Sequence, residues 1–178
     1  WVSFPGSPHL YTGVNPNTGI VTDRSGVQLL DSTGDRTYSE DRILRESTLH
    51  LLGDRYGYIE APVLGHYSDK LVGYNVITGL FHTKDEVRTA ELSLSAKAQA
   101  AAYSALAGRK GTVGVYNYRT GEILCAVTSP SYDPDNVPDI EHDETGTYDG
   151  VYVNRFFSAT YTPGSIFKVL TTAAALEQ

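Results

Sequence analysis

Two residues near the end of the sequence, Ser165 and Lys168, have types and a spacing that suit nucleophilic chemistry. They stand in the box Pro-Gly-Ser-Ile-Phe-Lys at residues 163–168. Side chains three positions apart lie on one face of a helix, so an amine would lie beside a hydroxyl. Serine needs a base to become a nucleophile, and a lysine amine removed from water can take its proton. The spacing predicts acyl transfer with Ser165 as nucleophile and Lys168 as base, although a helix-start serine beside a surface lysine would show the same pattern.

A hairpin and a helix that must position this pair can be predicted upstream. Residues 112–118 and 122–128 have the pattern of two strands joined by a tight loop, in which Gly121 suits a left-handed backbone. Apolar side chains fall on both faces of this hairpin, which predicts cover by helices on both sides. Cys125 alternates with apolar neighbours along the second strand, so we expect a buried structural thiol.

Longer stretches of the chain place the box in a known context. Residues 111–134 contain Thr-Gly-Glu-Ile-Leu and Pro-Ser-Tyr-Asp-Pro, and with the box at 163–168 they resemble the start of a penicillin-binding transpeptidase domain. Residues 19–30 resemble the Asp-Arg-Asn-Gly hairpin of class B (monofunctional) members, and residues 73–80 are similar to a segment of their non-catalytic domain, especially in Gram-positive proteins. Ile166 replaces the family's common threonine, and the family's Ser-x-Asn and Lys-Thr-Gly motifs do not occur in these 178 residues in the family's order after the box.

The fold expected from the sequence and this resemblance is α+β. A non-catalytic pedestal or dimerisation-type domain is expected over residues 1–91, and the start of a penicillin-binding/β-lactamase-like transpeptidase domain over residues 92–178. The second part is expected to open with a helix that Ser95 caps and that runs to Ala107, closed by Gly108. Its core stripe would be Ala98 or Gln99, Ala102, Tyr103 and Leu106. The hairpin and the nucleophile helix would follow.

The first part is expected to contain a hairpin that turns at residues 23–26 and a helix that ends at Gly53. Thr37 and Glu40 form a capping-box pattern at the start of that helix. Its core stripe would comprise Ile43, Leu44, Ser47, Leu51 and Leu52, and its charged residues would form the solvated face: Glu40, Asp41, Arg42, Arg45 and Glu46.

Composition excludes several kinds of site. A net charge of −7 argues against nucleic-acid binding, and a single cysteine excludes an internal disulfide framework. His50, His66 and His82 are sixteen residues apart, which is unlike the short paired spacing of metal ligands. The acidic stretch at residues 130–149 matches no calcium-loop spacing, so a solvated loop is favoured. We expect neither a metal nor a cofactor.

The resemblance implies a peptidoglycan D,D-transpeptidase that cleaves the terminal D-Ala-D-Ala bond of stem peptides through an acyl-serine and is acylated by β-lactams. Partners would include a membrane-embedded glycan polymerase and cell-wall assembly proteins. The enzyme would work on the outer face of the bacterial cytoplasmic membrane, held by a single anchor ahead of this chain. Residues 151–157 would pack beneath the nucleophile helix. The 178-residue chain by itself is expected to be inactive.

Two other functions remain open on the sequence. A β-lactam sensor or hydrolase would use the same Ser-x-x-Lys box, and it would differ from a transpeptidase in how long it holds a bound penicillin. A non-catalytic cell-wall assembly scaffold would be indifferent to replacement of Ser165 in cells.

Overall fold

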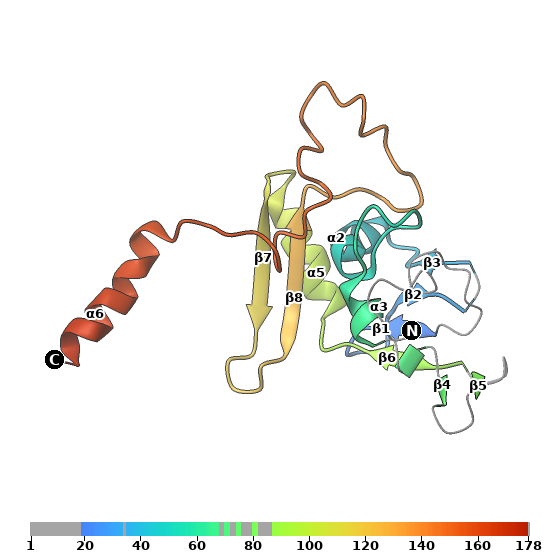
Figure 1. The fold of residues 1–178 in the computed structure, drawn as a ribbon, viewed down its shortest axis with the longest axis horizontal. Coiled ribbons are helices and arrows are strands. Elements are labelled where there is room, and N and C mark those ends of the chain that lie inside the picture. The colour runs from blue at the N-terminus through green and yellow to red at the C-terminus, as the bar shows by residue number, and fades with distance from the viewer. Residues whose placement is uncertain are drawn as a thin grey trace.

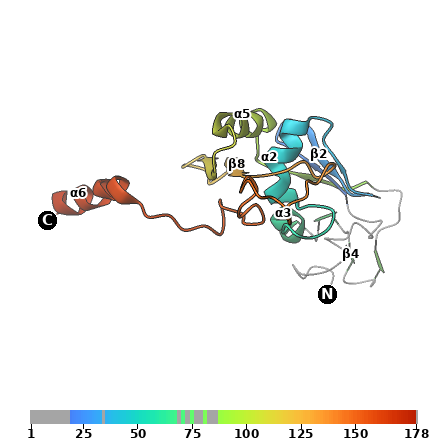
Figure 2. The ribbon, with the colours of Figure 1, turned by 90° about the horizontal axis from the view of Figure 1, so that it is seen from above.

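The computed structural model describes residues 19–33, 35–67, 70–71, 74–75, 80–81 and 87–177. The chain forms an α+β body, and the last helix stands away from it (Figures 1 and 2). A four-stranded sheet, a two-stranded pair and a long hairpin are separate sheets in this body, with strand order β3-β2-β1-β6 in the first. The predicted α+β class is confirmed. Within the described ranges, every helix is too short or too polar to cross a membrane.

The chain enters the first sheet through the predicted hairpin of β1 (Ile20–Thr22) and β2 (Gln28–Asp31). Asp23 holds the turn, since its carboxylate accepts the backbone N–H groups of Ser25 at 2.8 Å and Val27 at 2.9 Å. Gly26 has a φ of 81°, which a residue with a side chain rarely adopts. β3 (Thr37–Tyr38) then pairs with β2, and β6 (Thr89–Glu91) pairs with β1 in parallel.

Helix α2 (Arg42–Leu52) begins later than the sequence predicted. Thr37 is committed to β3, where it pairs with Asp31, so it is not the helix cap. Asp41 takes that place, and its carboxylate accepts the backbone N–H groups of Ile43 and Leu44. The predicted end at Gly53 is confirmed, and a Cβ there would lie 2.7 Å from the Cβ of Ala61.

The predicted stripe of α2 is buried except at its first position, where Ile43 is 43% exposed. Leu44, Leu51 and Leu52 join a core with α3 (Pro62–His66) and the first sheet. A short pair, β4 (Tyr74–Asn75) and β5 (Leu80–Phe81), follows. Most of the family-like segment at residues 73–80, and also His82, lies outside the described residues.

Helix α5 (Ala96–Leu106) confirms the helix predicted after the first sheet. The Ser95 hydroxyl accepts the N–H of Ala98 at 3.4 Å, and the backbone turns left-handed at Ala107 and Gly108. Of the predicted stripe, Gln99 is fully buried, whereas three members are half-buried: Ala102, Tyr103 and Leu106.

Strands β7 (Gly111–Tyr116) and β8 (Ile123–Ser129) form the predicted hairpin. Gly121 has a φ of 79°, as its turn requires. Helix α5 covers one face, where the Cys125 thiol lies 3.7 Å from the carbonyl of Ala98. On the other face, the ring of Phe156, from an irregular segment, lies against Gly114 so closely that a Cβ there would be 2.2 Å from it. Helical cover of that face stays a prediction.

Gln99 closes the outer edge of β8. Its side-chain oxygen accepts the N–H of Ala126 at 2.6 Å, while its amide nitrogen donates to the Ala126 carbonyl at 3.3 Å and to the Ser47 carbonyl at 3.1 Å. The amide therefore pairs with β8 as a neighbouring strand would. It also joins α2, α5 and β8 through one buried side chain.

One apolar core reaches from the first sheet to the hairpin. Val21 and Leu30 of that sheet, Leu44 of α2 and Ala126 of β8 belong to the same cluster. The strands of the first sheet end at Glu91 and do not enter the β7–β8 sheet. The division into domains at residue 91 stays a prediction.

Candidate active site

Ser165 lies in a 3₁₀ turn (Gly164–Phe167), and Lys168 is the first residue of α6 (Lys168–Leu176). In a 3₁₀ turn the side chains at i and i+3 are eclipsed, so the hydroxyl and the amine would share one face. Gly164, with a φ of 53°, and Pro163, with a φ of −67°, shape the entry to the turn. Both residues are exposed, and the shared face of their side chains stays a prediction. Neither side chain has a hydrogen-bond or ion-pair partner within the described part of the chain.

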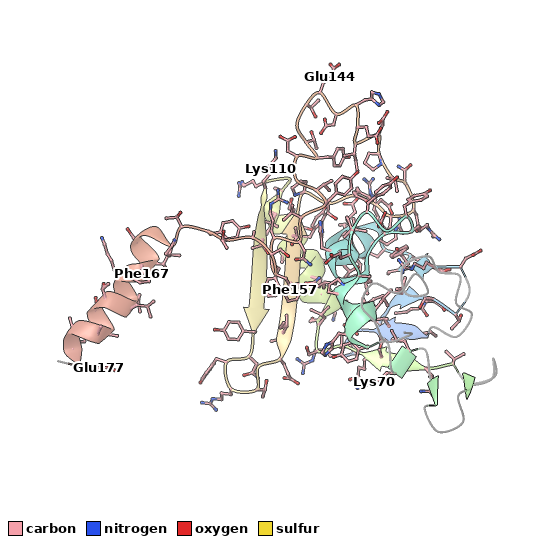
Figure 3. The ribbon with its side chains drawn as sticks, viewed as in Figure 1. Lys70, Lys110, Glu144, Phe157, Phe167 and Glu177 are labelled. Carbon is pink, nitrogen blue, oxygen red and sulfur yellow. The ribbon has the colours of Figure 1, made fainter. Side chains whose placement is uncertain are left out.

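Helix α6 carries this pair without a packing partner among the described residues. None of its residues is buried, and the helix stands clear of the body, as the positions of Phe167 and Glu177 show (Figure 3). Ile166, Val169 and Leu170 are each more than half exposed. Apolar side chains around most of a helix are typical of one that is buried on several sides.

The prediction that residues 151–157 pack beneath the nucleophile helix differs from the structure. Val151 is buried in a small cluster with Leu49 of α2 and Ile59, and Phe156 lies on β7 at Gly114. This segment therefore binds α2 and the hairpin. Ser165 follows the anchored Phe156 by nine residues, most of them exposed.

An ion pair anchors the start of the acidic loop on α2. The Arg45 guanidinium donates to both carboxylate oxygens of Asp133, with Nε–Oδ1 at 2.8 Å and Nη2–Oδ2 at 2.7 Å. This hydrogen bonding holds the pKa of the Asp133 carboxyl below its usual value of 3.8. The Ser131 hydroxyl also donates to the Glu46 carbonyl at 2.6 Å. The prediction that Arg45 lies on a solvated face is therefore wrong.

His50 anchors the other end of the loop. Its Nε2 lies 2.6 Å from the Val151 carbonyl, which can only accept, so Nε2 carries the proton. The side-chain amide of Asn154 donates to the His50 carbonyl at 2.6 Å. Burial lowers the pKa of the His50 imidazole to about 4. His50 is thus a buried, hydrogen-bonded histidine, and no group of residues in the described ranges has the composition of a metal site.

These anchors were missed in the sequence because their partners are far apart along the chain. Arg45 and Asp133 are 88 residues apart, and His50 and Val151 are 101 residues apart. A local signal existed for Arg45, since it lies four residues before the buried Leu49 on the same face of α2. The tip of the loop, marked by Glu144, extends away from α2 (Figure 3).

A mostly apolar groove of about 430 Å³ lies between α3, β8 and the connection that precedes α5. Its lining includes Val63, Leu92, Ile123 and Phe157. Phe157 lies beside β8 at the centre of the molecule (Figure 3). The groove includes neither Ser165 nor Lys168, so the exposed pair stands outside this concavity.

Comparison with known proteins identifies the segment that carries the pair. Residues 111–178 match the penicillin binding protein transpeptidase domain. The match begins at the first residue of β7 and includes the hairpin, the acidic loop and α6. The peptidoglycan D,D-transpeptidase PbpA of Mycolicibacterium smegmatis is 41% identical over 78 residues, which are 38% of this chain and 16% of that protein.

Two solved structures resemble nearly the whole chain. The D,D-transpeptidase domain of a peptidoglycan glycosyltransferase from Eggerthella lenta gives a TM-score of 0.67 at 29% identity and covers 90% of this chain. PBP2 of Pseudomonas aeruginosa, in complex with WCK 5153, gives a TM-score of 0.59 at 30% identity and covers 91% of this chain. The chain spans 37% and 39% of those two structures and about one sixth of PbpA.

Proposed function

We propose that this chain is part of a class B-type peptidoglycan D,D-transpeptidase in which Ser165 is the nucleophile and Lys168 its base. The observation that supports the proposal is that Ser165 lies in a 3₁₀ turn and Lys168 directly follows it at the start of α6, inside the segment that matches the transpeptidase domain. The substrate would be the D-Ala-D-Ala end of a stem peptide.

In the proposed reaction, the Ser165 oxygen attacks the carbonyl carbon of the penultimate D-alanine while its proton passes to the neutral Lys168 amine. The bond to the terminal D-alanine then breaks, and the leaving amine receives a proton. An amine from a neighbouring strand attacks the acyl-serine, forms the cross-link and releases the serine. The backbone N–H of Ser165 would supply one donor for the oxyanion.

The exposure of the pair bears directly on this chemistry. Water around an amine favours its charged form, and a charged amine cannot take a proton from serine. We therefore propose that further segments cover α6 in the working enzyme. The apolar side chains of the helix, including Ile166, Val169 and Leu170, support such cover.

Location and partners follow from the same proposal. An enzyme that cross-links stem peptides must act where peptidoglycan is assembled, so we propose the outer face of the cytoplasmic membrane and a membrane anchor ahead of this chain. A glycan polymerase would supply the strands. β-Lactams would acylate Ser165 because they resemble the scissile dipeptide.

Replacement of Ser165 by alanine in the full-length protein tests the proposal. Covalent labelling by a fluorescent penicillin should disappear, while the melting temperature should change little because the substitution removes a single hydroxyl oxygen. Ser158→Ala, at another exposed serine of the same segment, is the matched control and should label normally. Undiminished labelling of the Ser165 variant would remove that residue from the mechanism. Rapid release of the bound penicillin by the wild type would favour a hydrolase over a transpeptidase.

A further inference from the structure

Three tyrosine rings from two distant segments meet on the surface. The ring centroids of Tyr56 and Tyr58 are 6.1 Å apart, and those of Tyr58 and Tyr152 are 5.8 Å apart. The planes of successive rings are tilted by 43° and 40°, so the rings form a curved strip with Tyr58 in the middle. The exposed fractions are 68% for Tyr56, 64% for Tyr58 and 44% for Tyr152. We call these three residues the tyrosine strip.

Buried neighbouring residues and hydrogen bonds fix the backbone that carries the tyrosine strip. Ile59 and Val151, which directly follow Tyr58 and precede Tyr152, are buried together in one apolar cluster. The Asp54 carboxylate accepts the N–H groups of Tyr56 at 3.3 Å and Ile59 at 3.0 Å, which fixes the turn that contains Tyr58. The rings are therefore exposed while their backbone is fixed, and a surface that is ordered before binding loses less entropy when a ligand arrives.

The chemistry of the strip suits a saccharide. A pyranose ring presents a face of C–H groups with partial positive charge, which is attracted to the negative face of an aromatic ring. The sugar hydroxyls can bond to the phenol groups and to the neighbouring Arg55–Asp135 ion pair, whose side chains are each 36% exposed. An extended row of rings fits a linear chain of sugars better than a compact ligand.

The surroundings disfavour other polymers. Glu141 lies close enough to act electrostatically on Tyr152, and the Arg55 guanidinium is paired with Asp135, so a polyanion would gain little from this surface. Val153 adds one half-exposed aliphatic side chain, which is less apolar area than the centre of a protein interface usually presents.

We propose that Tyr56, Tyr58 and Tyr152 form a binding strip for a neutral glycan strand, with Tyr58 as its central stacking residue. The identity of that strand rests on the proposed function, in which the glycan of peptidoglycan carries the stem peptides. The strip would hold the polymer while a stem peptide reaches Ser165.

The test is co-sedimentation of the full-length protein with insoluble chitin, a neutral linear chain of N-acetylated amino sugars, and in parallel with intact peptidoglycan. Tyr58→Ala should bind about three- to tenfold more weakly, and Tyr58→Phe, which keeps the ring, should stay within about twofold of the wild type. Tyr118→Ala is the matched control, because Tyr118 is a 78% exposed tyrosine in the β7–β8 loop. It should bind as the wild type does.

Equal retention of Tyr58→Ala and Tyr118→Ala would overturn the proposal, as would retention on intact peptidoglycan without any on chitin. So would the loss of a protein partner from Tyr58→Ala with glycan retention intact. Penicillin labelling of the same proteins separates this proposal from the proposed function. Ring-dependent retention by a protein that penicillin does not label would uphold the strip while refuting the transpeptidase.

Discussion

The ion pair between Arg45 and Asp133 should be a major source of stability in the body of this protein. Two charged hydrogen bonds join the side chains, which are only 15% and 7% exposed. A hydrogen bond to a charged group contributes about 1.5–3 kcal/mol, and loss of one partner leaves the other charge partly buried. We expect Arg45→Ala and Asp133→Ala each to lower the free energy of unfolding by about 2–4 kcal/mol.

The pH dependence of this effect has a definite sign. The pKa of Asp133 is lowered in the folded state, so the folded protein favours the charged carboxylate. The contribution is full above the ordinary pKa of 3.8 and is lost as the pH falls through the lower folded value. The difference between wild type and Arg45→Ala should therefore be constant from neutral pH down to about pH 5 and shrink below about pH 4.

A double-mutant cycle by urea denaturation of the 178-residue chain measures the coupling between the two residues. We expect about 2 kcal/mol. Arg45→Lys should recover only part of it, because an ammonium cannot form the two-pronged contact. Arg42→Ala breaks the pair with Glu46 on the same helix, in which the Arg42 side chain is 71% exposed and that of Glu46 13% exposed, and it is the control, with a smaller expected effect. A coupling below about 0.5 kcal/mol, or one that persists unchanged at pH 2, would refute this account of the pair.

Three further outcomes are expected. Gln99→Leu should cost about 2–4 kcal/mol by urea denaturation, because the N–H and carbonyl of Ala126 lose their buried partner; a near-neutral result would mean that water replaces the amide. His50 has a pKa of about 4 when folded and an ordinary pKa of 6.5, so its neutral form stabilises the protein fully above pH 6.5 and by less as the pH falls towards 4. His50→Gln should remove this pH dependence, which amounts to roughly 3 kcal/mol in the free energy of unfolding between pH 6.5 and pH 4. An unchanged pH dependence in the variant would show that other groups cause it. Lys168→Arg should abolish penicillin acylation in the full-length protein, because a guanidinium stays protonated; acylation at the wild-type rate would show that another group is the base.

Local signals in the sequence located the turns and helix ends. Gly26, Gly53 and Gly121 have positive φ values where the sequence predicted turns or a helix end, because glycine adopts this backbone with little strain. The start of α2 was misplaced because Thr37 and Glu40 match a capping box, whereas Asp41 caps the helix. Thr37 could be excluded only through its strand pairing with Asp31, which is a tertiary contact.

Long-range contacts account for most of what the sequence did not predict. Helical spacing alone does not tell whether the side chain of Gln99 faces solvent or the core. The side chain is buried because it hydrogen-bonds to Ala126, 27 residues later. The anchoring of the acidic loop likewise depends on pairs about 90–100 residues apart, such as Arg45 with Asp133 and His50 with Val151. The Ser-x-x-Lys spacing was a local pattern, so the helical placement of Ser165 and Lys168 was predictable, whereas the exposure of the helix was not.

The amide of Gln99 also decides on which side of the β7–β8 hairpin another strand could pair. A strand edge with free N–H and carbonyl groups can recruit another strand, from the same protein or from a neighbour. On β8 these groups are occupied by Gln99, by the Ser95 N–H at the Leu124 carbonyl and by the Ser93 hydroxyl at the Ile123 carbonyl. In the described ranges β7 has no strand beside it other than β8. Any strand that extends this sheet must therefore join along Gly111–Tyr116, while the edge towards α5 is closed to pairing and to edge-to-edge aggregation.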